Sequence, residues 1–162
     1  MNEPRQEAGA VAVNGTLYVF CGVKGEDPLS SVEKMINAGG PQQGMSHWQM
    51  INFTEAQLFP RWSPCISMLT STEIVIMGGN SYNDDDELSS LGDVYIFNMQ
   101  TEKVERRVQN FAGLLQFHSV GNNCAQFESE NVVALVEDVD QTKTMVVEYK
   151  KGTRAVKTIK TL

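Results

Sequence analysis

Short apolar runs rich in β-branched residues dominate the chain, and polar segments holding glycine, asparagine and aspartate separate them. Two runs, residues 74–77 and 132–136, are apolar at nearly every position, which is typical of strands buried on both faces. Residues 94–97 and 145–149 predict further strands, and no segment keeps a helical period over ten residues. The pattern therefore predicts an all-β fold.

Residues 11–20 carry the clearest local signal, because two apolar runs flank the dipeptide Asn14-Gly15. This dipeptide readily adopts the two positive φ angles of a type I′ turn, which joins antiparallel strands tightly. A β-hairpin is predicted here. Residues 37–47 and 80–92 are rich in turn-forming residues and are predicted as loops, the second with an acidic run at residues 84–87.

The strands recur along the chain. An offset of 57 residues lays residues 17–20 over 74–77, and an offset of 59 lays 74–77 over 133–136 and Cys65 over Cys124. A third and a fourth strand follow in each unit, at 31–35 and 47–53, at 93–98 and 103–108, and at 145–149 and 155–162. The sequence thus predicts one domain, 1–162, made of three four-stranded units at about 1–54, 55–110 and 111–162.

The second unit resembles a Kelch repeat. It opens with Pro60-Arg61, has Gly78-Gly79 after the apolar strand and continues with Val94-Tyr95 in the third strand, as the Kelch pattern does. The resemblance covers nearly the whole chain, but it weakens in the other two units.

The first unit has Pro4-Arg5, Gly22 and Trp48 in Kelch positions, but Cys21 replaces the first glycine and Met35 the aromatic residue. The third unit is degenerate, with residues 117–119 (Phe-His-Ser) in place of Pro-Arg and no tryptophan.

The resemblance implies Kelch-type β-propeller blades, three antiparallel four-stranded sheets whose faces pack on one another. A closed propeller typically has four to eight blades, so three form an incomplete propeller. Self-association or further blades are therefore expected to complete it.

The same resemblance implies that a ligand binds across one face, built by the loop after the glycine pair and the loop leading into the next Pro-Arg. Arginine offers paired donors to carboxylate or phosphate, and tyrosine is an efficient interface anchor. The alternative is that each arginine bonds backbone within its own blade. The candidate partner-binding residues are Arg5, Lys24, Arg61, Asn80, Ser81, Tyr82 and His118.

Composition narrows the function classes. The net charge of −7 argues against nucleic-acid binding, and no apolar stretch approaches the length of a membrane helix. The N-terminus shows no secretory signal. Cys21, Cys65 and Cys124 lie far apart in apolar segments, which predicts buried free thiols in a reducing compartment, the cytoplasm.

No catalytic signature is found, neither a Gly-x-Ser-x-Gly elbow nor a phosphate-binding loop, and the acidic run lacks the ligand spacing of a calcium loop. The sequence therefore predicts a non-catalytic module without metal or cofactor, which binds a protein or peptide. An enzyme on a propeller scaffold, of the sugar oxidase or sugar epimerase class, is the alternative. The resemblance also raises a ubiquitin-ligase adaptor, because Kelch domains often accompany a BTB domain in such ligases.

Overall fold

The structure is a computed structural model that describes residues 1–36, 47–54, 57–108, 124–126, 130–137, 144–153 and 155–161. Sixteen strands and no helix occur in these ranges, and every strand pair is antiparallel. No helix able to span a bilayer is therefore present in the described ranges. The predicted all-β fold is confirmed.

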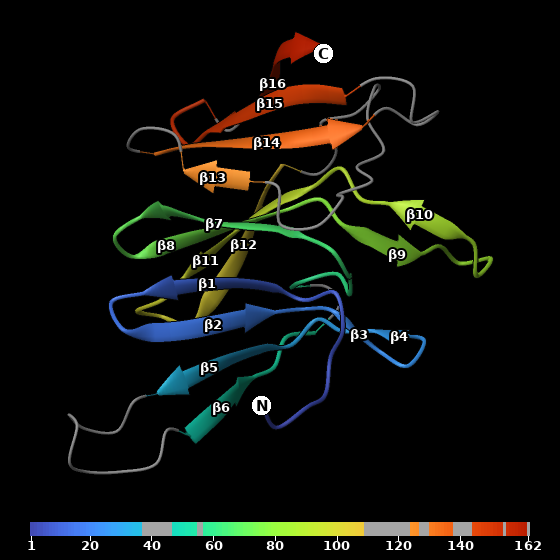
Figure 1. Ribbon diagram of the computed structural model, residues 1–162, viewed down its shortest axis with the longest axis vertical. Helices are drawn as coiled ribbons and strands as arrows, with labels where there is room; N and C mark the ends of the chain where they lie inside the picture. The colour runs from blue at the N-terminus through green and yellow to red at the C-terminus, as the bar shows by residue number, and fades with distance from the viewer. Residues whose placement is uncertain are drawn as a thin grey trace.

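Three four-stranded sheets, called blades 1 to 3, lie one above another in Figure 1. Blade 1 contains, in order across the sheet, β1 (Gly9–Val13), β2 (Thr16–Phe20), β5 (Val32–Ile36) and β6 (His47–Ile51). Blade 2 contains β7 (Cys65–Thr70), β8 (Glu73–Met77), β11 (Val94–Asn98) and β12 (Lys103–Val108). Blade 3 contains β13 (Cys124–Gln126), β14 (Asn131–Glu137), β15 (Thr144–Lys150) and β16 (Ala155–Thr161).

Two small sheets add to the three that the sequence predicts, so the described residues form five sheets. One is the hairpin of β3 (Val23–Lys24) and β4 (Asp27–Pro28), and the other is the hairpin of β9 (Asn80–Tyr82) and β10 (Leu88–Ser90). The prediction of a loop over residues 80–92 is therefore wrong in part, because strands of three residues are too short to show a period. The other predicted loop, residues 37–47, lies outside the described residues except for His47, which begins β6.

The hairpin predicted over residues 11–20 is confirmed. Val13 pairs with Thr16, and Asn14 and Gly15 between them have φ angles of 49° and 77°. Both central residues are thus in the left-handed region that a type I′ turn requires.

The blades pack through alternate residues of blade 2. Ile74 and Ile76 belong to the core shared with blade 1, whereas Val75 and Met77 belong to the core shared with blade 3. All four side chains are at most 1% exposed, which confirms a strand buried on both faces. The first strands lie together, with β7 in contact with both β1 and β13. A Cβ atom on Gly9 of β1 would overlap the Ile66 side chain of β7, so the approach requires glycine.

The offset of 59 that superposes the second and third units does not match the faces of their strands. An offset of 59 places Val75 over Ala134. Val75 faces the following blade, blade 3, whereas Ala134 faces the preceding blade, blade 2, so the two side chains lie on opposite faces of their sheets. Side chains alternate along a strand, so an odd error in the offset exchanges the two faces. Val132 and Ala134 pack on blade 2, and Val133 lies on the opposite face.

The cysteines correct a second expectation. Cys65 of β7 and Cys124 of β13 form a disulfide, with their Cα atoms 5.7 Å apart. The prediction of three free thiols is therefore wrong for this pair, because the stacking of blades 2 and 3 brings together residues 59 positions apart. Cys21 is the free, buried cysteine that the sequence predicts.

Candidate functional site

The β3–β4 and β9–β10 hairpins project from the same side of the blades (Figure 1). Each begins after a glycine with a φ of 95°, Gly22 in blade 1 and Gly79 in blade 2. A Cβ atom at Gly22 would lie 2.6 Å from the carbonyl oxygen of Gln6, and one at Gly79 would lie 2.6 Å from that of Trp62. Only glycine fits both the φ angle and this close backbone approach.

The segments that lead into each blade hold the hairpins in place. Gln6 and Val23 exchange two backbone hydrogen bonds of 2.9 Å, and Trp62 and Asn80 exchange two of 2.9 and 3.0 Å. The Gly22 N–H also donates to the Arg61 carbonyl at 2.9 Å, which ties blade 1 to blade 2. We call the exposed surface of the two hairpins and the adjoining residues Gln6, Glu7, Trp62 and Ser63 the loop face.

Arg61 of blade 2 is buried beneath the loop face and bonds the backbone there. Its Nη1 donates to the Gly78 carbonyl at 2.8 Å, and its Nε donates to the Phe59 carbonyl at 3.0 Å. Its two Nη atoms reach the two Asp93 carboxylate oxygens at 2.6 and 3.2 Å, and its guanidinium lies 4.9 Å from the centre of the Tyr95 ring. Burial lowers the pKa of Arg61, but Asp93 outweighs this effect and leaves the pKa above its ordinary value.

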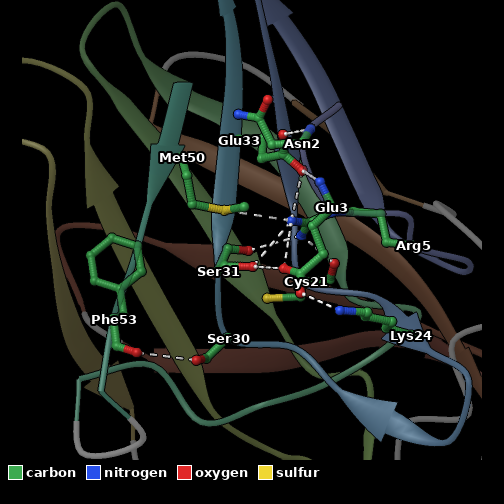
Figure 2. Close-up of polar contacts among 10 residues, drawn as sticks. All are labelled: Asn2, Glu3, Arg5, Cys21, Lys24, Ser30, Ser31, Glu33, Met50 and Phe53. Carbon is green, nitrogen blue, oxygen red and sulfur yellow. Dashed lines mark hydrogen bonds and ion pairs between the residues drawn. The ribbon is translucent and has the colours of Figure 1, made fainter. Parts of the chain in front are cut away.

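Arg5 occupies the equivalent position in blade 1, and Figure 2 shows its polar contacts. Its Nη1 donates to the carbonyl oxygens of Cys21 at 2.7 Å and Ser31 at 3.1 Å, and its Nη2 donates to Glu33 at 3.0 Å. Glu3 lies 3.5 Å from the same Nη2. The Nε atom of Arg5 is buried without a hydrogen-bond partner in the part of the chain that the structure describes.

Glu33 stays charged in this buried position. Burial raises its pKa, but the backbone N–H groups of Asn2 and Glu3 donate to its carboxylate at 2.5 and 3.1 Å, and Arg5 adds a positive charge. These donors outweigh burial and leave the pKa of Glu33 below its ordinary range.

Neither arginine side chain is exposed, since both have a relative exposure of 0%. The alternative in which each arginine bonds backbone within its own blade therefore describes their contacts, and direct contact with a partner does not fit this burial. The two arginines instead hold the carbonyl groups from which the hairpins start. Asn80 and Ser81 are also buried, at 8% and 3% exposure.

Lys24 and Tyr82 are the predicted site residues that the structure exposes on the loop face. Asn80 supports the hairpin of Tyr82 from inside, because its Oδ1 accepts a hydrogen bond from Ser90 across β9 and β10. His118 lies outside the described residues, so the contribution of blade 3 to the loop face stays a prediction.

Two apolar residues on the loop face are missing from the sequence-based set. Leu88 is 58% exposed and lies opposite Tyr82, itself 39% exposed, in the β9–β10 hairpin. The Trp62 ring packs on Tyr82 with centroids 5.0 Å apart. Trp62 follows the Pro-Arg pair directly, which is a signal the sequence offered. The sequence analysis did not select Leu88 because this residue follows an acidic run in a segment predicted as a loop.

The acidic run lies at the tip of the same hairpin. The Asn83 Oδ1 accepts hydrogen bonds from the backbone N–H groups of Asp85 at 3.0 Å and Glu87 at 2.8 Å, which closes the tip. All residues from 83 to 87 are exposed, so the carboxylates point into solvent. In the ranges the structure describes, no group of three or more His, Cys, Asp or Glu residues is arranged to hold a metal ion.

Cys21, beneath the β3–β4 hairpin, is the one free thiol in these ranges. Burial raises the pKa of this thiol to about 11, and the nearby Arg61 and Arg5 offset only part of that rise. The side chain is therefore a neutral thiol at pH 7 and not a nucleophile.

Comparison with known proteins adds a family motif and a fold. The family profile of the Kelch motif matches residues 4–35, which include Arg5 and the glycine turn of blade 1. YjhT, a solved Kelch-type propeller, matches 96% of this chain and 51% of its own with a TM-score of 0.62 and 13% sequence identity. The chain thus spans about half the length of YjhT. No curated protein sequence matches the chain.

Proposed function

We propose, from the premise that this chain carries a Kelch motif and has the fold of a Kelch-type propeller, that it is a non-catalytic binding module. Its ligand is a protein or peptide, and it binds on the loop face. The observation that carries the proposal is the apolar cluster of Tyr82 and Leu88, exposed on the β9–β10 hairpin, with the half-buried Trp62 ring packed on Tyr82.

The cluster has the character of an interface anchor. Aromatic residues dominate binding energy at protein interfaces when they stand in a preorganised setting. Tyr82 is held by the Trp62 ring on one side, and its strand is joined to the Trp62 backbone through Asn80. A partner that covers Tyr82 and Leu88 therefore orders few additional side chains, which lowers the entropic cost of binding.

The surroundings of the cluster favour a basic partner. Asp84, Asp85, Asp86 and Glu87 are exposed at the tip of the hairpin that carries Tyr82. Such a rim attracts positive charge during encounter and disfavours acidic partners. The proposed ligand is therefore a segment with an apolar side chain next to lysine or arginine.

A phage-displayed random peptide library, panned on the immobilised chain, tests the proposal. We expect selected peptides to combine an apolar residue with basic residues, and the double variant Tyr82→Ala/Leu88→Ala to lose at least tenfold in affinity for them. Thr101→Ala is the matched control, because Thr101 is exposed in the β11–β12 turn, at the opposite end of the strands from the loop face. Peptides that bind the double variant and the wild type equally would overturn the assigned face.

The absence of catalysis is part of the proposal and has its own test. Metal analysis of the purified chain, combined with a carbohydrate turnover screen, separates a binding module from a sugar oxidase or epimerase. A stoichiometric copper content or turnover of a sugar would refute the proposal.

The cytoplasmic location and the ubiquitin-ligase adaptor role stay predictions. The Cys65–Cys124 disulfide favours a different location, since disulfides persist mainly in oxidising compartments. Mass spectrometry of the alkylated, unreduced protein from its native cells decides the location, because a cytoplasmic chain should carry three alkylated cysteines and an oxidised chain one.

A further inference from the structure

A covalent bond joins blade 3 to blade 2. The Cys65–Cys124 disulfide links β7 and β13, the first strands of the two blades, which lie in contact (Figure 1). The two cysteines are 59 positions apart, so the bond closes a long loop of chain. In the chain-entropy account of disulfides, a cross-link over a loop of this length adds substantially to the stability of the folded state.

The apolar junction between blades 2 and 3 has smaller side chains than the junction between blades 1 and 2. Blade 1 contributes Tyr18 and Phe20, whose rings lie 5.9 and 5.4 Å from the Phe97 ring of blade 2. The buried residues that blade 3 contributes, in the part of the chain that the structure describes, are Val132, Ala134, Val147 and Tyr149. An aromatic ring buries more apolar area than valine or alanine, so packing holds blade 1 to blade 2 more strongly than it holds blade 3.

The polar links between blades 2 and 3 are long or partly exposed. The Leu69 carbonyl of β7 accepts hydrogen bonds of 3.3 Å from the Glu130 backbone N–H and from the Gln126 side-chain amide. Lys151 pairs with Glu73 at 2.6 Å, but the lysine side chain is 33% exposed, and exposed ion pairs contribute little to stability. The disulfide is therefore the strongest single link between these two blades among the described residues.

The disulfide can be approached from the side of Cys124. Cys65 is only 5% exposed, whereas Cys124 is partly exposed and is followed in β13 by the exposed residues Ala125 and Gln126. Thiol–disulfide exchange begins when a thiolate reaches one of the two sulfur atoms, so the Cys124 Sγ is the atom open to attack. Cys21 is buried in blade 1 as a neutral thiol and does not compete in this exchange.

We infer that the Cys65–Cys124 disulfide is a redox-controlled fastener of blade 3, which a protein dithiol opens. Opening loosens blade 3 from blade 2 because the remaining contacts at this junction are small apolar side chains and weak polar links. Blades 1 and 2 stay packed, since the aromatic rings that join them do not depend on the bond.

The opening reaction is a two-step exchange. A thiolate of the dithiol attacks the Cys124 Sγ, the S–S bond breaks, and the Cys65 sulfur leaves as a thiolate that takes up a proton. The second thiol of the reductant then attacks its own sulfur in the mixed disulfide and passes its proton to the departing Cys124 sulfur. Two electrons have moved to the chain, which now has two thiols, and the reductant has become a disulfide.

Buffers of reduced and oxidised dithiothreitol test whether the bond opens in the folded chain. The protein is incubated without denaturant, then denatured and alkylated, and its mass gives the number of alkylated cysteines. We expect one, Cys21, under oxidising conditions and three under reducing conditions, and thioredoxin in catalytic amount should speed the change. A bond that is reduced only after the chain is unfolded in urea, or three alkylated cysteines under every condition, would overturn the inference.

Hydrogen exchange measured by mass spectrometry tests what the bond holds. On reduction we expect the amides of β14 and β15 to exchange at least about tenfold faster, because the local opening of blade 3 then costs less free energy. The amides of β1, β2 and β5 in blade 1 should exchange at unchanged rates. Equal rates in the oxidised and reduced proteins, or an equal rise in all three blades, would refute the role of the bond as a fastener of blade 3.

The double variant Cys65→Ala/Cys124→Ala is the matched control for the reductant. Its blade 3 amides should exchange as fast as those of the reduced wild type, and dithiothreitol should leave them unchanged. The reduced wild type keeps both cysteine side chains, so this agreement assigns the effect to the bond and not to lost apolar contacts. A reductant that loosens blade 3 in the double variant as well would act by another route and would contradict the inference.

Discussion

Blades 1 and 2 hold the same arginine in two different ways. In both, the guanidinium is fully buried and donates to the carbonyl of a residue with positive φ, Cys21 in blade 1 and Gly78 in blade 2. Blade 2 pairs Arg61 with a single carboxylate, Asp93, through both Nη atoms. Blade 1 has no aspartate at that position.

The carboxylate of blade 1 comes from a position two residues later. Ser31 is the counterpart of Asp93, because the backbone N–H of Cys21 donates to Ser31 as that of Gly78 donates to Asp93. Glu33 then takes the position that Tyr95 has in blade 2. Residues two apart on a strand point to the same face, so Glu33 still reaches the arginine.

The comparison shows which part of the motif the fold requires. The bond from arginine to the carbonyl before the glycine is kept in both blades, and the source of the negative charge is free to move along the strand. Blade 1 has the less complete arrangement, since the Arg5 Nε is buried without a partner in the described structure whereas the Arg61 Nε bonds the Phe59 carbonyl.

Removing each arginine is expected to have the largest effect and to separate the two blades. Arg61→Met should lower the free energy of unfolding by about 3–5 kcal/mol, because it leaves the Asp93 charge buried. Arg5→Met should cost less, since Glu33 keeps two backbone donors and Glu3 is partly in water. Urea denaturation measures both, and equal losses would contradict the proposed difference.

Alanine substitutions at the glycine turns are expected to destabilise the two blades equally. Gly22→Ala and Gly79→Ala should each lower the free energy of unfolding by about 2–3 kcal/mol, because the new Cβ meets a carbonyl oxygen at a strained φ.

Gly25→Ala is the control for the φ angle alone. Gly25 has a φ of 65° with nothing within 4 Å of its Cβ position, so we expect a loss of only about 1 kcal/mol. Thermal unfolding of the three variants checks this order, and a Gly25 variant as unstable as the others would remove the steric argument.

Protonation of Glu33 in blade 1 is expected to have the smallest effect on the free energy of unfolding. The folded-state pKa of Glu33 lies below its ordinary value of 4.5, so the folded chain binds this proton less readily than the unfolded chain does. The resulting stabilisation is complete above about pH 4.5 and is lost as the pH falls through the folded-state value. Unfolding free energies between pH 3 and 6 should therefore fall less steeply for Glu33→Gln than for the wild type. Parallel curves would contradict this assignment.

Much of the fold could be predicted from local sequence. Asn14-Gly15 specifies its turn through the φ angles of two adjacent residues, and the apolar run at 74–77 specifies a strand covered on both faces. The loop face was predicted less well. The pattern located Arg61 and Tyr82, but it did not show that one side chain points into the blade and the other into solvent.

The sequence by itself determined the strands, the turn at Asn14-Gly15 and the recurring Pro-Arg and glycine positions, because these follow from the preferences of neighbouring residues. The tertiary structure decided the register of blade 3, the Cys65–Cys124 disulfide and the burial of the arginines. Each of these depends on contacts between distant residues, 59 positions apart in the disulfide and 32 in the Arg61–Asp93 pair. The stacking of blades 2 and 3 brings the two cysteines together, and the pairing of strands within blade 2 brings Arg61 to Asp93, so no local pattern records these contacts.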